Sequence, residues 1–164
     1  MAASSRIPSL GHRGEGWVAL QFICLGAIAL LGMRELPDAL ANSATRMPEL
    51  VVGLAVMAIG GLVILLGLSE LGSNLSVMPR PRQGSALIQS GIYARIRHPM
   101  YAGLIELSLG WAAVTSSGAA FVVCLALAVV LDLKARREEA WLTENFPDYP
   151  DYRQRTRRFV PYVY

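Results

Sequence analysis

The sequence predicts an all-α integral membrane protein with about four transmembrane helices, a C-terminal helical hairpin, and a cytosolic loop and tail. Three observations predict this class. Of the 164 residues, 54% are hydrophobic and only 16% are charged, whereas a typical soluble domain has about 25% charged residues. Two apolar segments reach the roughly 20 residues that a bilayer span needs. The basic residues are distributed unevenly along the chain.

The first two spans are predicted at residues 17–36 and 50–68. Pro37 and Pro48 are expected to bracket the short outer loop between them. Within the second span, glycines recur every seven residues, at Gly53, Gly60 and Gly67. Because this spacing keeps small residues on one helix face, another helix is expected to pack closely there.

Residues 69–99 interrupt the apolar pattern. A continuous helix is ruled out by Pro79, Pro81, Gly84 and Gly91. Irregular backbone cannot face lipid, so this loop should fold over the cytosolic ends of the helices. Pro99 suits the first turn of the next helix, where its missing N–H costs nothing. The chain therefore divides into a membrane part, residues 1–68, and a loop, hairpin and tail, residues 69–164.

The third and fourth apolar runs are residues 101–114 and 119–133. The turn between them, residues 115–118, is so short that the two runs should form an antiparallel helical hairpin. From this turn, the arm back to Tyr101 is about 24 Å long and the arm on to Glu138 is about 31 Å long. Glu138 should therefore lie level with the loop that carries His98, although the two are far apart in sequence.

The basic residues indicate the orientation. With four spans and a cytosolic N-terminus, only Arg34 and Arg46 of the 15 basic residues fall outside the cytosolic parts. This bias places both termini, the 69–99 loop and the tail in the cytosol. Lys134 is the only lysine, and arginine and alanine are abundant. This usage favours a prokaryotic cell, and thus its inner membrane; in a eukaryote the expected membrane is the endoplasmic reticulum.

Neither nucleic acid nor a metal ion is expected as a partner. The net charge of +3 reflects the uneven placement of arginines and does not form a nucleic-acid footprint. Cys24 and Cys124 both lie inside apolar spans, where cysteine is more often a small packing residue than half of a disulfide or a metal site. The expected partners are the lipid bilayer and a lipid-like small molecule.

The most informative motif is Arg97 to Tyr101, with the sequence Arg-His-Pro-Met-Tyr, where a basic, Pro-rich loop meets an apolar helix. Ser-Gly-Ile-Tyr precedes it at residues 90–93, and Glu138-Glu139 and an aromatic tail follow it. Together these motifs resemble the isoprenylcysteine carboxyl methyltransferase family, membrane enzymes that use S-adenosylmethionine. The resemblance runs from about Leu71 to Pro161, more than half of the chain.

The resemblance implies a cofactor site on the cytosolic loop and the hairpin. In the eukaryotic members of the family, the cofactor is contacted by residues that match Ser85, Ala86, Leu87, Ile88, Tyr93, His98, Pro99, Met100, Tyr101 and Glu138. The residue types suit this ligand. A helix N-terminus at Pro99 offers N–H groups and a positive dipole end to the cofactor's carboxylate. Glu138 can pair with its ammonium group, and the two tyrosines can pack against it.

Arg97, Glu106 and Lys134 are the candidate catalytic residues. The family has an arginine that meets the substrate carboxylate where this chain has Lys134, and lysine cannot form the two-pronged pair that arginine forms with a carboxylate. Glu106 lies inside the third apolar run, where a charge costs about 2.5–3.5 kcal/mol. It is therefore expected to face the bundle interior and to line the acceptor pocket.

The predicted function is transfer of a methyl group from S-adenosylmethionine to a lipid-like acceptor, such as the carboxylate of a prenylcysteine. A carboxylate is already ionised at neutral pH and needs no general base, whereas a phospholipid amine would need a base such as Glu106 or His98. That amine methyltransferase is one alternative. An NADPH-dependent enzyme is another, because membrane sterol reductases have an ending similar to residues 158–164. A non-catalytic membrane module is the third.

Overall fold

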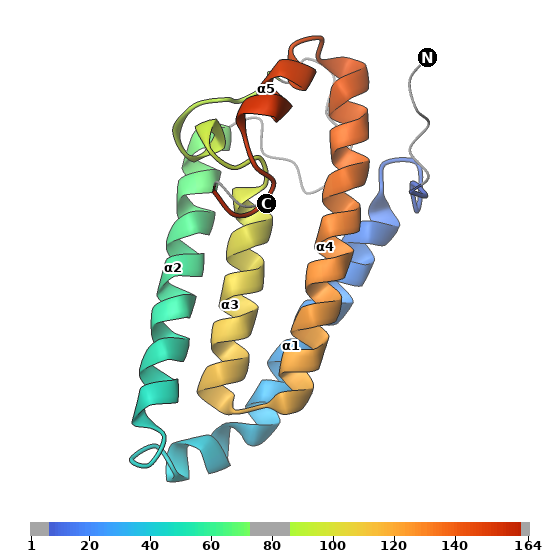
Figure 1. The fold of residues 1–164 in the computed structure, drawn as a ribbon. Coiled ribbons are helices and arrows are strands. Elements are labelled where there is room, and N and C mark those ends of the chain that lie inside the picture. The colour runs from blue at the N-terminus through green and yellow to red at the C-terminus, as the bar shows by residue number, and fades with distance from the viewer. Residues whose placement is uncertain (1–6, 73–85, 162–164) are drawn as a thin grey trace.

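The structure is a computed structural model that describes residues 7–72 and 86–161. In this part of the chain it is helical, with five α-helices and a short 3-10 helix, η2 (Figure 1). In chain order these are α1 (Glu15–Ala41), α2 (Met47–Leu71), η2 (Gly91–Ala94), α3 (Pro99–Thr115), α4 (Gly118–Asn145) and α5 (Tyr149–Arg155). Three of them, α1, α2 and α4, are long and apolar enough to cross a membrane.

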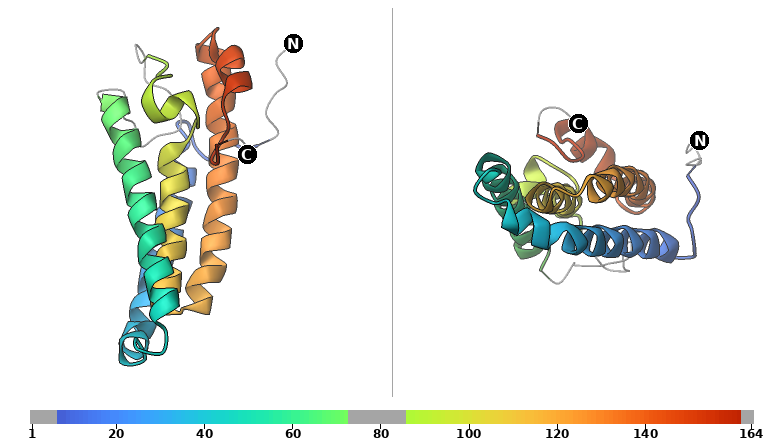
Figure 2. Two further views of the ribbon diagram at one scale, coloured as in Figure 1. Left: turned by 60° about the vertical axis from the view of Figure 1, so that its left-hand side comes forward. Right: turned by 90° about the horizontal axis from the view of Figure 1, so that it is seen from below.

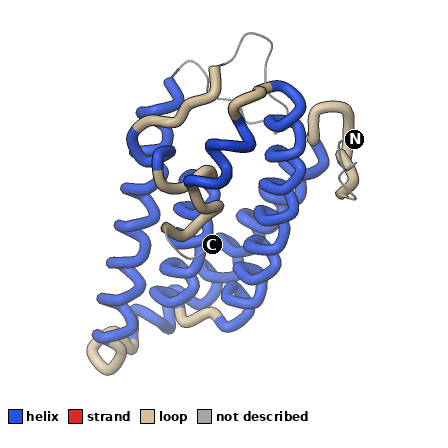
Figure 3. Tube along the Cα trace, turned by 45° about the horizontal axis from the view of Figure 1, so that its top comes forward, coloured by secondary structure: helices blue, strands red, loops and turns tan. Residues whose placement is uncertain are grey.

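The four long helices form an antiparallel bundle, in which α2 packs against α3, and α1 packs against both α3 and α4 (Figure 2). The start of α1, η2 and α5 lie at one end of this bundle, and the α1–α2 and α3–α4 turns lie at the other (Figure 1). The irregular segment before α3 and the tail after α5 cover the first of these ends (Figure 3). The described ends of the chain thus lie at the same end of the bundle.

Glycines bring α2 and α3 unusually close together. Gly53, Gly60 and Gly67 are buried along α2. A Cβ atom added at Gly60 would lie 2.7 Å from the carbonyl oxygen of Gly103 in α3, and one added at Gly110 would lie 2.6 Å from that of Gly53. The predicted close contact with another helix is confirmed, and the partner is α3. It carries glycines with the same seven-residue spacing.

Replacing Gly60 by alanine is expected to lower the free energy of unfolding by about 1–3 kcal/mol, because the added methyl group overpacks the contact with α3. The matched control is Gly61→Ala, since a Cβ at Gly61 meets nothing within 4 Å. This control should be neutral or stabilising, because alanine favours helix over glycine by up to about 1 kcal/mol. Thermal unfolding in one detergent, followed by tryptophan fluorescence, compares the two. Equal midpoints would contradict the tight contact.

The prediction that Pro37 and Pro48 bracket the loop between the first two spans is wrong for Pro37. Pro37 lies inside α1, which continues to Ala41, whereas Pro48 lies in the first turn of α2 as predicted. A proline in a helix removes one hydrogen bond to the preceding turn. The turn after Pro37 is secured separately, because both the backbone N–H and the side-chain amide of Asn42 donate to the Asp38 carbonyl, at 3.1 and 2.9 Å.

Candidate functional site

The α3–α4 hairpin brings Glu138 next to His98. At the turn, the Ser117 hydroxyl caps α4 by accepting a hydrogen bond from the Ala120 N–H at 3.2 Å. At the opposite end of the hairpin, the His98 Nδ1 atom lies 3.8 Å from Glu138 Oε2. The Tyr101 hydroxyl donates a 2.8 Å hydrogen bond to the same oxygen. The predicted meeting of these distant residues is confirmed.

Aromatic rings enclose the His98 imidazole, which is 6% exposed. It stacks on Tyr101, with 5.2 Å between ring centroids and 5° between ring planes. Phe159, from the tail, meets it edge-on at 6.2 Å. The His98 backbone N–H donates to the Arg158 carbonyl at 3.1 Å, so the tail partly covers the first turn of α3. His98 is therefore part of the wall of the site, held from two sides.

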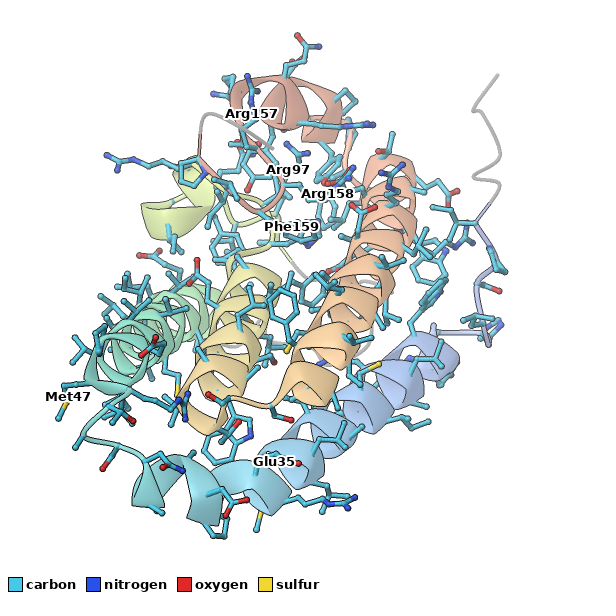
Figure 4. All side chains as sticks on the ribbon, turned by 60° about the horizontal axis from the view of Figure 1, so that its bottom comes forward. Glu35, Met47, Arg97, Arg157, Arg158 and Phe159 are labelled. Atoms are coloured by element: carbon cyan, nitrogen blue, oxygen red, sulfur yellow. The ribbon has the colours of Figure 1, made fainter. Side chains whose placement is uncertain are left out.

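The buried carboxylate of Glu139 in α4 binds both the loop before α3 and the tail. It is 3% exposed and accepts hydrogen bonds from Arg97 Nε at 3.0 Å and from Arg158 Nε and Nη2 at 3.1 Å each. Arg158 also pairs with Asp132 of α4 at 2.8 Å. Figure 4 shows Arg97 and the tail residues Arg158 and Phe159 close together beside α4. The network fastens the tail and the motif loop to α4.

Arg97 belongs to this framework. Its Nη1 atom donates to the carbonyl oxygens of Thr156 and Arg153, at 2.6 and 3.1 Å. Its side chain is 8% exposed. The neighbouring backbone forms a parallel β-bridge between Ile96 and Arg157. The predicted catalytic role of Arg97 stays a prediction, and these contacts favour a role in positioning the loop.

Lys134 lies one helical turn before Glu138 and is 2% exposed. Its ammonium group donates a 2.6 Å hydrogen bond to Gln21 Oε1 in α1. The same group lies 4.9 Å from the centroid of the Tyr101 ring. Lys134 thus faces the cluster formed by Tyr101 and Glu138. Gln21 is not among the residues predicted from the sequence, although an uncharged polar residue inside an apolar span indicates a buried polar contact.

Glu106 lies on a different side of α3. It faces the bundle interior as predicted, because a Cβ at Gly60 of α2 would lie 2.9 Å from the Glu106 Cβ atom. Its Oε2 atom is buried without a hydrogen-bond partner in the described part of the chain. Five residues separate it from Tyr101, which is about 140° around a helix. Glu106 therefore lies on another face of α3 than Tyr101, and its predicted place in the acceptor pocket stays a prediction.

The other predicted cofactor residues that the structure describes belong to η2, to the segment before it and to the start of α3. Tyr93, in η2, is buried, and its carbonyl accepts a 2.7 Å hydrogen bond from the Tyr152 hydroxyl. Burial raises the pKa of Tyr93 above its usual range, and the negative charge of Glu138 raises it further. The Tyr93 hydroxyl therefore stays protonated. Three others belong to the segment before η2, where Ala86 is exposed and Leu87 and Ile88 are half-buried. Pro99 and Met100 begin α3, and Ser85 lies outside the described residues.

An open apolar groove of about 460 Å³ lies at the other end of the bundle. Residues from α2, from the α3–α4 turn and from the start of α4 line it, among them Val52, Ser116 and Phe121. None of the predicted site residues takes part in it. The candidate site is therefore the polar cluster at the His98 end of the hairpin.

Two bacterial proteins are similar to this chain. The cobalt-zinc-cadmium resistance protein CzcN of Cupriavidus metallidurans is 34% identical over 107 residues, which cover 60% of this chain and 50% of that protein. The nickel-cobalt-cadmium resistance protein NccN of Alcaligenes xylosoxydans xylosoxydans is 35% identical over 81 residues, which cover 49% of this chain and 38% of that protein. The chain thus spans half or less of the length of these relatives. Residues 7–72 and 86–161 contain no group of three or more His, Cys, Asp or Glu that could hold a metal ion.

The family model that describes phospholipid methyltransferases matches residues 48–149. This range runs from the first turn of α2 to the first residue of α5 and leaves out α1. It contains the hairpin and every residue of the cluster formed by His98, Tyr101, Lys134 and Glu138. Because the match covers more than half of the chain, this protein belongs to the phospholipid methyltransferase family.

Proposed function

We propose that this chain is an integral membrane methyltransferase that uses S-adenosylmethionine and methylates the carboxylate of a lipid-like acceptor, a prenylcysteine or a similar amphiphile. The family supplies the reaction class. The finer resemblance to isoprenylcysteine carboxyl methyltransferases supplies the acceptor class. The single observation that carries the proposal is the contact of His98 and Tyr101 with Glu138.

The residues of the cluster fit the cofactor. S-adenosylmethionine supplies a methyl group activated by a positive sulfonium. Glu138, whose side chain is 25% exposed, would hold the ammonium group of its amino acid part. Tyr101 orients this carboxylate through its hydroxyl, and Tyr93 presents a ring and a protonated hydroxyl. Ser85, Ala86, Leu87, Ile88, Pro99 and Met100 are proposed as further contacts.

The acceptor carboxylate is ionised at neutral pH, so this chain needs no general base. Its residues would act by aligning the two reactants and excluding water, effects that supply roughly 7–11 kcal/mol in well-oriented systems. Lys134, buried one turn deeper than Glu138, would hold the acceptor headgroup. Arg97 would position the loop through Glu139.

We also propose four spans with both termini in the cytosol of a bacterial cell. The fourth span is α3, whose 17 residues extend about 26 Å, close to the hydrocarbon thickness of about 30 Å. The cofactor would enter from the cytosol at the end of the bundle that carries η2 and α5. The acceptor would enter between the helices from the bilayer.

A binding and labelling experiment tests the proposal. Purified protein in lipid nanodiscs should bind S-adenosylhomocysteine and should not bind NADPH. With radiolabelled cofactor, label should appear as a base-labile ester on a prenylcysteine. Label on phosphatidylethanolamine would instead support the amine alternative, which the name of the family favours. Binding of NADPH alone would favour the reductase alternative, and binding of neither ligand would favour a non-catalytic module.

The role of Glu106 can be tested separately. Its place beside Gly60 leads us to expect that Glu106→Gln changes kcat and the acceptor KM by less than about twofold, since the variant keeps the side-chain volume and a carboxylate acceptor needs no base. Methyl transfer to N-acetyl-S-farnesylcysteine measures both constants. A large rise in the acceptor KM would support the predicted place of Glu106 in the acceptor pocket. A large fall in kcat would indicate a role in proton transfer.

A further inference from the structure

Gln21 belongs to α1, outside the part of the chain that the family model matches. It is 8% exposed and lies in residues 17–33 of α1, a stretch that is otherwise apolar. A polar side chain inside a membrane span is costly and is usually found where it has a polar partner. Here the partner is Lys134, whose ammonium donates to Gln21 Oε1 at 2.6 Å. A helix outside the matched region thus contributes to the candidate site.

The positive charge of Lys134 is not neutralised by this contact, because an amide is uncharged. Within residues 7–72 and 86–161, no ion pair shorter than 4 Å includes Lys134. Glu138 pairs with His98, Glu139 pairs with arginines and His98, and Asp132 pairs with arginines. A buried ammonium carries a large desolvation penalty, and the charge of Glu138, one turn along α4, offsets only part of it. The Tyr101 ring, 4.9 Å away, offsets part of it. A bound anion next to the ammonium would offset more of this penalty.

The charges of the site lead to the same conclusion. Lys134 and Glu138 cancel each other, and bound S-adenosylmethionine adds one net positive charge, because its ammonium and carboxylate cancel and its sulfonium remains. An anionic acceptor would bring the total to zero, whereas a protonated amine would raise it. Opposite charges attract strongly in a site that excludes water.

We propose that Gln21 and Lys134 together form the binding site for an anionic acceptor headgroup, and that Gln21 is the residue that sets selectivity for a carboxylate over an uncharged headgroup. The amide of Gln21 fixes the lysine through its oxygen and also carries N–H donors. A carboxylate beside the ammonium and this amide would receive two kinds of donor, which a lone lysine cannot provide. This inference rests on the proposed function of the site.

Binding of two matched amphiphiles tests the proposal without any turnover. The probes are S-farnesylthioacetic acid and its carboxamide, bound to the full chain in nanodiscs of zwitterionic lipid. Their headgroups are similar in size, but the acid has an ionised carboxylate and the carboxamide has an uncharged amide. The wild type should bind the acid at least about tenfold more tightly than the carboxamide. Gln21→Glu puts a carboxylate on Lys134, so this preference should fall below about twofold through weaker binding of the acid. Lys134→Met should have the same effect.

The control is Arg136→Met, which removes a positive charge from the same helix but from an exposed side chain paired with Asp132. This variant should keep the preference for the acid. Equal binding of acid and carboxamide by the wild type, or an unchanged preference in Gln21→Glu, would overturn the proposal. Binding of S-adenosylhomocysteine, measured on the same samples, reports on the proposed function separately. Gln21→Glu should leave that affinity within about twofold.

Discussion

Replacing Glu138 by glutamine is expected to lower kcat/KM for methyl transfer about a hundredfold. The proposed partner of Glu138 is the cofactor's ammonium group, and removing one partner of a desolvated charge pair costs about 2–5 kcal/mol. The substitution keeps the side-chain volume and leaves an amide oxygen to accept the Tyr101 hydroxyl, now 2.8 Å from Oε2. The loss should therefore appear in cofactor affinity, measured as the dissociation constant of S-adenosylhomocysteine by calorimetry.

Two controls separate this charge pair from a general effect on the site. Methylthioadenosine lacks the amino acid part of the cofactor, so Glu138→Gln should leave its affinity unchanged. Glu144 lies further along α4 and is exposed, and Glu144→Gln should bind S-adenosylhomocysteine like the wild type. If Glu138→Gln weakened both ligands equally, the carboxylate would not be the ammonium site.

The features that the sequence predicted well depend on local spacing. The seven-residue glycine repeat of α2 requires only one regular helix to place Gly53, Gly60 and Gly67 on one face, and they do lie against α3. The meeting of His98 and Glu138 requires only two helices of known rise and a short turn. Both predictions use distances measured along a helix, which the sequence determines directly.

The features that it did not predict depend on how separate elements pack. Gln21 meets Lys134 because α1 packs against α4, and no periodicity within either helix contains that contact. The position of Glu139 next to Glu138 in the sequence does not predict a role of its own. Its role depends on the tail, which packs against α4 so that Arg158 donates to the same carboxylate oxygen as Arg97. The extension of α1 past Pro37 is an exception, because the contact of Asn42 with the Asp38 carbonyl at its end is local.

Replacing each of the adjacent acids by glutamine should therefore have different effects. Glu138→Gln should lower cofactor affinity, whereas Glu139→Gln should lower stability. Successive residues point about 100° apart around a helix, so one carboxylate faces Tyr101 and the other faces the arginines. Glu139→Gln leaves Arg97 without its carboxylate partner in a buried position, and breaking a buried pair costs about 3–5 kcal/mol. We expect a marked fall in the unfolding midpoint and faster trypsin cleavage after Arg153 and Arg155. Both arginines lie in the segment that this network holds.

Glu138→Gln is the stability control for Glu139→Gln, since both remove one negative charge from the same turn of α4. It should keep the wild-type midpoint and protease resistance while losing cofactor affinity. Because Glu139 is 3% exposed, added salt should screen its pairs little, so the difference between the two variants should persist in 0.5 M salt. An unchanged midpoint and an intact tail in Glu139→Gln would show that the bridge between Ile96 and Arg157, together with the Phe159 contact, holds the tail without the carboxylate.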